Sequence, residues 1–230
     1  MENNSFNLDL SDFRYEKKFK INNSSLKLIN NFLSENELRF IKSFSTRKIN
    51  SIYFDTNELN FYNENIEGFS KRKKYRFRWY GNIIEDKNID CNLEIKIKDG
   101  LRGIKKIFPI KSFMFNKKGN FSYEFNKSSL PKNIFNQLKI LKPQLFVSYK
   151  REYYVSKISK IRLTIDKNIC YQRLYSKNKI RKNIKILSND IILELKYPYD
   201  TSPQFIKALE LPFRLSKNSK YVEGLNKYIR

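Results

Sequence analysis

Charged and apolar residues alternate with period two in several segments of this chain, a pattern that predicts β-strands with two unlike faces. In the segment 74–80, Arg76 and Arg78 share one face and three aromatic side chains occupy the other. Four further segments repeat this alternation, namely 14–21, 93–98, 161–166 and 191–196. Residues 146–154 also have the pattern of an extended strand, with Arg151 between two tyrosines on one face. We therefore expect about six strands, each with one charged face.

Segments with helical periodicity lie between these strands. Apolar residues over 26–33 follow a serine that can cap a helix. A serine and a proline open a second helical segment over 129–141, and two short helices are expected near 203–211 and 221–229. Residues 174–190 show no clear period and are expected to form a loop or an irregular hairpin. Since no internal repeat or linker separates these segments, the sequence predicts a single α+β domain.

The chain is strongly basic. It has 47 Lys and Arg residues against 23 Asp and Glu, a formal net charge of +24, while 40% of its residues are hydrophobic and 15% aromatic. This hydrophobic content is that of a folded protein, and the charge indicates a polyanionic partner such as nucleic acid, an acidic membrane face or phosphates. The charge alone does not choose among these partners, because the sequence is also rich in Asn and Ile.

The sequence carries no membrane or secretory signal. Its longest apolar runs are a few residues, far below the ~20 needed to cross a bilayer. Residues 1–4 have neither the basic start nor the apolar stretch of a secretory signal. A cytoplasmic location without a membrane span is therefore expected, and any membrane link would need a separate partner protein.

The chain contains no histidine and only two cysteines, Cys91 and Cys170. This composition excludes a Ser-His-Asp or Cys-His nucleophile and every His-ligated zinc site. The cysteines form no CxxC pair, so they predict neither a metal site nor a disulfide framework. Catalysis must then use carboxylates, Lys, Arg, Tyr or a metal held by oxygen ligands, for which Mg²⁺ and Mn²⁺ are the natural ions.

The charged strand faces allow two interpretations. A half-buried strand normally turns its polar face to water, and each strand taken alone fits that interpretation. Several such faces could instead point into a closed antiparallel barrel, with helices covering the apolar outer face. Periodicity does not say which face is inside. In either case Trp79, Tyr149 and Tyr153 are expected to be packing groups.

Eight segments in order resemble the VTC domain, a branch of the CYTH or triphosphate-tunnel superfamily. They are FRYEKKFKI (13–21), SIYFDTNELNFY (51–62), KRKKYRFRWYG (71–81), LEIKIKDG (93–100), VSYKREYYV (147–155), IRLTIDKNI (161–169), LELKYP (193–198) and SKNSKYVEGL (216–225). The resemblance implies an antiparallel β-barrel tunnel of about eight strands with helices packed around the outside. It also implies transfer of the γ-phosphoryl group of ATP onto a growing polyphosphate chain, with Mn²⁺ or Mg²⁺ as cofactor.

The resemblance assigns roles to residues that match the family's motifs. Phosphate binding is assigned to basic residues spread over these segments, which are Lys18, Arg76, Arg78, Lys96, Lys105, Arg151, Arg162, Lys217 and Lys220. Catalysis is assigned to Arg76, Arg78, Lys96 and Glu194, and Glu194 is also the expected metal ligand.

Other carboxylates have less direct expected roles. Glu16 and Glu94 would either assist Glu194 or orient neighbouring cations, and the alternative for Glu194 itself is a salt bridge among basic residues. Asp166 is expected to have a structural or supporting role, and Asp55 is expected to cap the turn that follows it.

Three functions remain open on the sequence alone. The first is a polyphosphate polymerase that uses ATP, and the second is a hydrolase of tripolyphosphate or polyphosphate with the same fold. The third is a non-catalytic module that binds nucleic acid or polyphosphate through charge. No helix-turn-helix, zinc-finger or RNA-binding signature supports specific nucleic-acid binding. The oligomeric state is not predicted.

Overall fold

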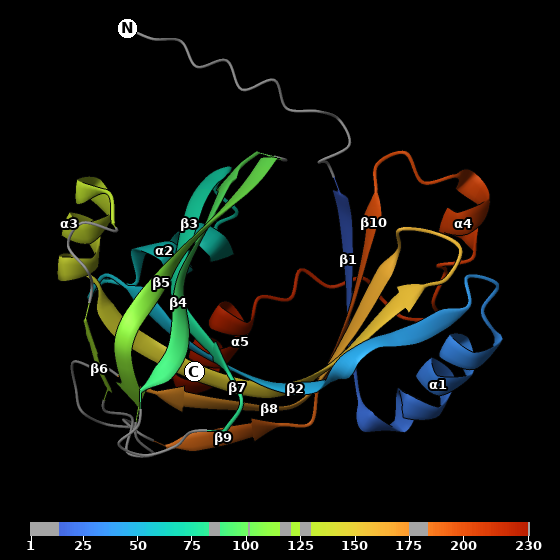
Figure 1. Cartoon of the computed structure of the whole chain (residues 1–230), viewed down its shortest axis with the longest axis horizontal. Helices are drawn as coiled ribbons and strands as arrows, with labels where there is room; N and C mark the ends of the chain where they lie inside the picture. The colour runs from blue at the N-terminus through green and yellow to red at the C-terminus, as the bar shows by residue number, and fades with distance from the viewer. Residues whose placement is uncertain are drawn as a thin grey trace, which may run out of the picture. The chain divides into compact units, whose positions relative to one another are not determined.

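A computed structural model of the chain describes residues 14–82, 88–100, 102–115, 121–124, 130–174 and 184–229 (Figure 1). The strands among these residues are β1 (Arg14–Ile21), β2 (Phe40–Asp55), β3 (Lys71–Tyr80), β4 (Ile89–Asp99), β5 (Arg102–Phe115), β6 (Phe121–Glu124), β7 (Lys142–Ser156), β8 (Arg162–Arg173), β9 (Lys185–Ser188) and β10 (Ile191–Pro198). The helices are η2 (Asn23–Ser25), α1 (Leu26–Glu35), α2 (Asn60–Ile66), α3 (Lys132–Ile140), α4 (Pro203–Lys207) and α5 (Lys220–Ile229).

The chain divides into two compact units, and each has its own hydrophobic core. Unit 1 comprises residues 1–46, 151–167 and 189–218, and unit 2 comprises residues 47–150, 168–188 and 219–230. The long strands β2, β7 and β8 contribute residues to both units. The single domain expected over residues 1–230 stays a prediction.

Unit 1 is a sheet packed against short helices. Its hydrogen-bonded strands follow the order β1-β10-β8-β7-β2, and the registers of β1 with β10 and of β10 with β8 are antiparallel. The apolar faces of these strands pack with α1 into a core that includes Phe19, Ile29, Leu163, Leu193 and Leu195. The apolar residues of the alternating segments are therefore the buried ones, as their period of two requires.

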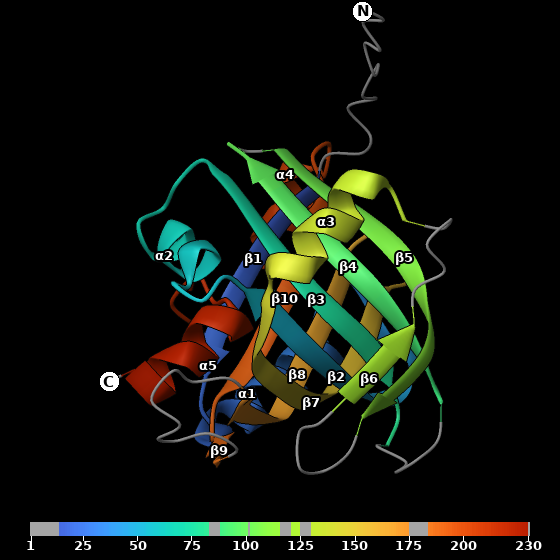
Figure 2. The same ribbon diagram turned by 90° about the vertical axis from the view of Figure 1, so that its left-hand side faces the viewer.

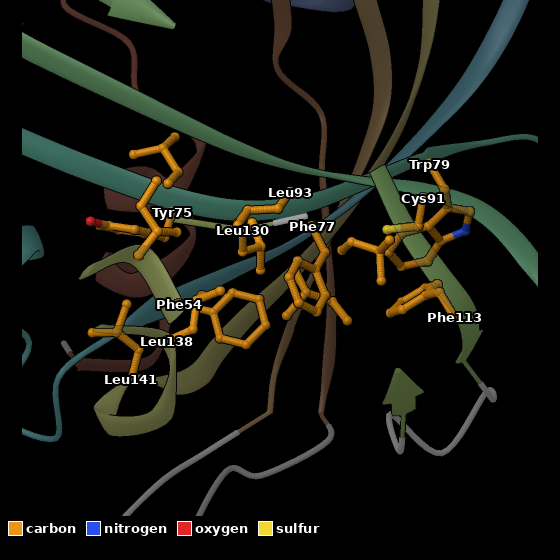
Figure 3. Close-up of a cluster of buried hydrophobic side chains, with 14 of the residues drawn as sticks. Phe54, Tyr75, Phe77, Trp79, Cys91, Leu93, Phe113, Leu130, Leu138 and Leu141 are labelled. Carbon is orange, nitrogen blue, oxygen red and sulfur yellow. The ribbon is translucent and has the colours of Figure 1, made fainter. Parts of the chain in front are cut away.

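Unit 2 has a larger sheet, in the order β9-β8-β7-β2-β3-β4-β5-β6. Helix α3 lies across the sheet in front of β3 and β4 (Figure 2) and contributes Ile134 and Leu138 to the core. The aromatic face of β3 lies in this same core, where Phe77 and Trp79 are fully buried and Phe113 of β5 packs against both (Figure 3). Since α3 and this core lie on the aromatic face of β3, Arg76 and Arg78 belong to the opposite face.

Asp55 ends β2 and accepts hydrogen bonds at the start of α2, whereas the sequence predicted only that it caps the turn that follows it. Its carboxylate accepts hydrogen bonds from the backbone N–H groups of Thr56, Phe61 and Tyr62 at 2.7–3.0 Å. Leu59 enters the helix in the left-handed backbone region, with φ of 61°. A helix with four unpaired N–H groups at its start needs acceptors of this kind, so Asp55 has the structural role expected of it.

The predicted fold class is confirmed, because the described strands are mostly antiparallel and the helices few. Among the described residues of each unit, the hydrogen-bonded strands follow an open path rather than a closed ring. All six alternating segments are strands, although β8 and β7 extend well beyond their predicted limits. Residues 184–190, expected to be irregular, contain β9 paired with β8, while residues 175–183 lie outside the described part.

Several described elements were not predicted by the hydrophobic pattern, and β2, α2 and β5 are the longest of them. Strand β2 is exposed over most of residues 41–47 and buried over 49–55, so it has no single period. Helix α2 is short and depends on the cap that Asp55 provides. Strand β5 leaves Ile104 and Ile107 more than half exposed, so its apolar residues do not mark one buried face. None of the described helices has the length and apolar character that a membrane crossing requires.

Candidate functional site

Basic side chains of unit 2 gather on the face of its sheet opposite α3. We call this group the Arg76 cluster; it comprises Lys74, Arg76, Arg78, Glu94, Lys96, Lys105 and Lys220. The register of the strands aligns them, since Arg76 lies opposite Glu94, and Lys96 lies opposite both Lys74 and Lys105. Residues directly opposite in antiparallel strands point to the same side. The charged positions that alternate along each strand therefore lie side by side across neighbouring strands and form one basic patch.

Glu94 is the shared partner of three cations in this cluster. Its Oε2 accepts from Nε of Arg76 at 2.8 Å and lies 2.6 Å from Nη2 of the same guanidinium. Nη1 of Arg78 lies 3.5 Å from Oε2, and Nζ of Lys105 donates to Oε1 at 2.7 Å. The side chain of Glu94 is only 7% exposed. Glu94 therefore orients the cations around it, one of the two roles expected of it.

The protonation states follow from this geometry. Burial raises the pKa of Glu94, but Arg76, Arg78 and Lys105 outweigh that effect and lower it to about 2. Burial lowers the pKa of Lys105, and its hydrogen bond to Glu94 opposes the shift only in part. Burial also disfavours the charge of Arg76, but Tyr53 and Glu94 raise its pKa overall. At neutral pH the cluster holds one carboxylate against several cations, so it carries excess positive charge.

Two tyrosines complete the surroundings of the arginines. Nη1 of Arg76 donates to the hydroxyl of Tyr53 at 3.1 Å, and Nη2 of Arg78 donates to the hydroxyl of Tyr149 at 3.3 Å. Nε of Arg78 is buried and has no hydrogen-bond partner among the residues that the structure describes. Tyr149 was expected only to pack, and this polar contact corrects that interpretation. The sequence could have indicated this role, because Tyr149 lies two residues before Arg151 and therefore on the same face of the strand.

The N-terminal turn of α5 adds a second layer to the cluster. Nζ of Lys74 donates to Oγ of Ser219 at 2.8 Å, and Nζ of Lys220 lies 4.6 Å from the centre of the Tyr149 ring. Both α5 residues come from the segment 216–225, which is distant in sequence from β3. Lys96 has an exposed side chain and lies opposite Lys105, so it extends the basic cluster from β4 to β5.

The second group of charged residues lies in unit 1. We call it the Glu194 cluster; it comprises Glu16, Lys18, Arg151, Arg162, Thr164, Asp166, Glu194 and Lys196. Lys18, Glu194 and Thr164 form one row across β1, β10 and β8, and Glu16, Lys196 and Arg162 form the next. Nζ of Lys196 lies 2.6 Å from Oε1 of Glu194, and Lys18 is paired with Glu16.

Glu194 is buried, with 7% of its surface exposed. Burial alone would raise the pKa of its carboxyl group, but Lys18, Lys196 and Arg151 together lower that pKa well below its ordinary range. The carboxylate is therefore ionised at neutral pH. The ion pair with Lys196 was the alternative to metal binding that the sequence left open, and an ionised carboxylate is compatible with both.

Arg151 is held by Asp166 in a two-pronged contact. Nε and Nη2 of the guanidinium lie 2.6 and 2.7 Å from the two carboxylate oxygens, and Asp166 is fully buried. Such a fork geometry fixes the plane of the guanidinium. Asp166 therefore has the supporting role expected of it, since it orients a residue assigned to phosphate binding.

The structure thus distributes the predicted residues over two clusters. Those in unit 2 are Arg76, Arg78, Lys96, Lys105 and Lys220, and those in unit 1 are Lys18, Arg151, Arg162 and Glu194. Arg162 is exposed at the end of β8. Lys217 is exposed in unit 1 and lies in neither cluster as defined here. Their roles in binding and catalysis stay predictions.

The residues around Glu194 fit a metal that arrives bound to phosphate. Within the described part of the chain, no group of three or more acidic, histidine or cysteine side chains could hold a metal ion. Glu194 nevertheless offers ionised oxygen atoms, and Oγ1 of the facing Thr164 is buried without a hydrogen-bond partner in the described part of the chain. Mg²⁺ is commonly held by one or two carboxylates together with substrate phosphates and water. Glu194 and Thr164 are therefore sufficient to bind a metal ion only when substrate phosphates supply further ligands.

Comparison with known proteins gives a family match over almost the whole chain. The model of the VTC domain matches residues 13–229. No curated protein matches the sequence. Among solved structures, the PH1819 protein of Pyrococcus horikoshii is similar at a TM-score of 0.50 and 14% identity, covering 94% of this chain and 99% of that one. This similarity concerns the fold alone.

Two further structures are similar at lower scores. A Vibrio parahaemolyticus protein described as a candidate adenylate cyclase has a TM-score of 0.47 and 12% identity, over 93% of this chain and 98% of its own. A Hippeastrum protein described as having a dominant triphosphatase activity has a TM-score of 0.45 and 13% identity, over 93% and 96%. Neither similarity bears on what this chain does.

Proposed function

Because the chain belongs to the VTC domain family, we propose that it is a polyphosphate polymerase: it binds ATP and a polyphosphate chain through its basic clusters and transfers the γ-phosphoryl group of ATP to the chain end. The Arg76 cluster is the observation that carries this proposal. In it, one buried carboxylate holds Arg76 and Lys105 in place at 2.6–2.8 Å. The cluster as defined has six Lys and Arg side chains and one carboxylate, so its net charge is positive.

Phosphate groups suit this charge in sign and in hydrogen-bond geometry. A guanidinium binds phosphate oxygens through two parallel hydrogen bonds, and an ammonium supplies a compact charge. Since Glu94 and Tyr53 already fix the guanidinium of Arg76, binding loses little side-chain entropy there. A string of phosphates therefore suits the cluster better than a single one.

The reaction needs positioning and neutralisation of charge more than covalent work by the protein. A terminal oxygen of the polyphosphate forms a new bond to the γ-phosphorus, and the bond from that phosphorus to the bridging oxygen breaks, leaving ADP. Arg76, Arg78 and Lys96 would stabilise the charge on the transferring group. A direct transfer of this kind requires no histidine, and the chain has none.

Glu194 would hold a divalent cation, Mn²⁺ or Mg²⁺, together with substrate phosphates. Such an ion polarises a phosphoryl oxygen and neutralises charge on the leaving group. Lys18, Lys196 and Arg151 keep the Glu194 carboxylate ionised, so the ligand oxygen is available without loss of a proton. The cations around it also disfavour a bare metal ion, which makes binding of metal and phosphate mutually dependent.

The test is incubation of the purified protein with ATP and Mn²⁺, followed by gel analysis of polyphosphate and assay of ADP. Replacement of Arg76 and Arg78 by Ala should reduce chain growth at least about a hundredfold, because removing one donor to a developing charge typically costs that much. Lys105→Ala should reduce it less. Lys139→Ala on α3, on the opposite side of the sheet, is the matched control and should leave the rate unchanged.

Hydrolysis is separated from synthesis in the same experiment. Tripolyphosphate is supplied without nucleotide, and released phosphate is measured. If phosphate is released but no chain grows with ATP, the protein is a hydrolase that uses the same site, and the polymerase hypothesis is wrong. A protein that does neither, yet binds long duplex DNA with a steep salt dependence, would be the binding module instead.

A further inference from the structure

The basic cluster of unit 2 depends on a helix that reaches it from a distant part of the sequence. Ser219 and Lys220, at the start of α5, meet Lys74 and Tyr149 of the cluster. The carbonyl of Ser219 accepts the first hydrogen bond of the helix, from the N–H of Glu223 at 2.9 Å. The position of this first turn therefore decides whether its polar groups lie at the cluster.

Tyr221, in that first turn, is tied to a buried carboxylate. Its hydroxyl donates to Oδ2 of Asp55 at 2.6 Å, the length expected of a hydrogen bond to an ionised oxygen. Asp55 is fully buried and Tyr221 is 2% exposed. The carboxylate of Asp55 also accepts from the backbone N–H groups of Thr56 and of Phe61 and Tyr62 in α2, so a single carboxylate joins the start of α2 to the start of α5.

The same tyrosine also contacts the arginine side of the cluster. Its ring stacks on that of Tyr53, with centres 5.3 Å apart and planes at 23°. The hydroxyl of Tyr53 in turn accepts from Nη1 of Arg76 at 3.1 Å. A continuous series of contacts therefore runs from Asp55 through Tyr221 and Tyr53 to Arg76, and every member of it belongs to unit 2.

The rest of α5 is held by other contacts. Asn226 accepts from the hydroxyl of Tyr62 at 2.5 Å. At the end of the helix, the hydroxyl of Tyr228 donates to the carbonyls of Tyr171 and Ile184 at 2.9 and 2.7 Å. Because these contacts hold the middle and the end of α5 without the hydroxyl of Tyr221, loss of the Asp55–Tyr221 bond should release the first turn alone.

We propose that Asp55 and Tyr221 are positioning residues for phosphate binding: their hydrogen bond seats the first turn of α5 so that Ser219 and Lys220 lie at the Arg76 cluster and Tyr53 supports Arg76. This inference rests on the proposed function in one respect, that the cluster binds a chain of phosphates. Neither Asp55 nor Tyr221 would touch the ligand. They act through Ser219, Lys220 and Tyr53.

The test compares two tyrosines of the same helix. Tyr221→Phe removes only the hydroxyl that Asp55 accepts, and Tyr228→Phe removes a buried hydroxyl at the far end of α5. We expect Tyr221→Phe to weaken binding of tripolyphosphate, measured by calorimetry, by about 3- to 10-fold, because the first turn must then be ordered on binding. Tyr228→Phe should leave the affinity within about twofold of the wild type, because its contacts lie at the other end of the helix.

Two further readouts separate positioning from a general loss of structure. In a Lys220→Ala background the effect of Tyr221→Phe should shrink, because residues that act through one another are not additive. Hydrogen exchange of the Glu223 amide, measured without ligand, should speed up in Tyr221→Phe and stay unchanged in Tyr228→Phe. The exchange measurement does not depend on any ligand.

The outcomes are distinct. Equal weakening by the two phenylalanine variants, or an unchanged exchange rate of Glu223 in Tyr221→Phe, would overturn the proposal. If the wild type binds no tripolyphosphate, the proposed function fails, and exchange at Glu223 alone decides whether Asp55 seats the first turn.

Discussion

At the scale of single residues, Glu94 has the largest influence on the candidate site. It is the acceptor that Arg76 and Lys105 share, and it lies within 3.5 Å of Arg78. Without it, Arg76, Arg78 and Lys105 would lose the carboxylate that they share while they lie close together, an arrangement that destabilises a fold. Glu94 thus stabilises the unit while it keeps the guanidinium of Arg76 in a fixed orientation.

The pH dependence of stability follows from the pKa of Glu94. That pKa is about 2 in the folded chain against an ordinary value of 4.5, so between these values the unfolded chain binds the proton more readily. Stability from Glu94 is therefore complete above about pH 4.5 and is lost as the pH falls toward 2; the shift corresponds to about 3 kcal/mol. We expect Glu94→Gln to lower the free energy of unfolding by about that amount at pH 7 and by clearly less at pH 3.

Urea unfolding of wild type and variant at the two pH values measures this difference. Glu67→Gln, at an exposed position after α2, is the control and should change little at either pH. A Glu94→Gln deficit that is the same at pH 3 and pH 7 would contradict the assigned ionisation.

At the scale of elements, helix α5 packs unusually close to the sheet of unit 2. Gly224, in the middle of the helix, is buried, and a Cβ atom at this position would overlap the side chains of Leu145 and Tyr171. Glycine is an unfavourable residue inside a helix by about 1 kcal/mol relative to alanine. Its presence here is therefore explained by the approach of the helix to β7 and β8 rather than by helix formation.

Gly224→Ala tests this close packing. Helix propensity alone would make alanine stabilising, whereas the steric overlap should destabilise unit 2 by about 1–3 kcal/mol. Denaturant unfolding measures the sign directly. A more stable variant would show that α5 can move away from Leu145 and Tyr171 without loss.

At the scale of the whole molecule, charge dominates the behaviour of the chain. Its formal charge of +24 opposes the compact state through self-repulsion and favours any polyanion. Screening by simple salt weakens interactions between exposed charges over about 8–10 Å at ordinary ionic strength. A ligand that bound specifically would stabilise the fold beyond this general effect.

Thermal unfolding distinguishes the two effects. Tripolyphosphate at about a hundredfold excess over its dissociation constant should add about 2.7 kcal/mol of stability, which corresponds to a rise in Tm of roughly 5–10 °C for a chain of this size. Sodium sulfate at matched ionic strength should give a much smaller rise. Equal shifts with both salts would indicate diffuse screening instead of a phosphate site.

Much of the fold could be predicted from the sequence because its strands have one charged and one apolar face. Arg76 and Arg78 lie on the face opposite the core, as their spacing of two requires. The pattern failed for β2, whose first half is exposed and whose second half is buried. It also failed for α2, because seven residues capped by Asp55 contain too few turns for a helical period to be seen.

The sequence by itself determined which residues are strand residues, which faces are charged, and which family the chain resembles, because these depend on order and spacing along the chain. Only the tertiary structure decided which charges are partners. Strand register determines that Glu94 accepts hydrogen bonds from Arg76 and Lys105. It also determines that Asp166 holds Arg151. Asp55 accepts a hydrogen bond from Tyr221, which lies 166 positions later in the chain. This contact depends on the folded path of the backbone, and a local sequence pattern contains no information about that path.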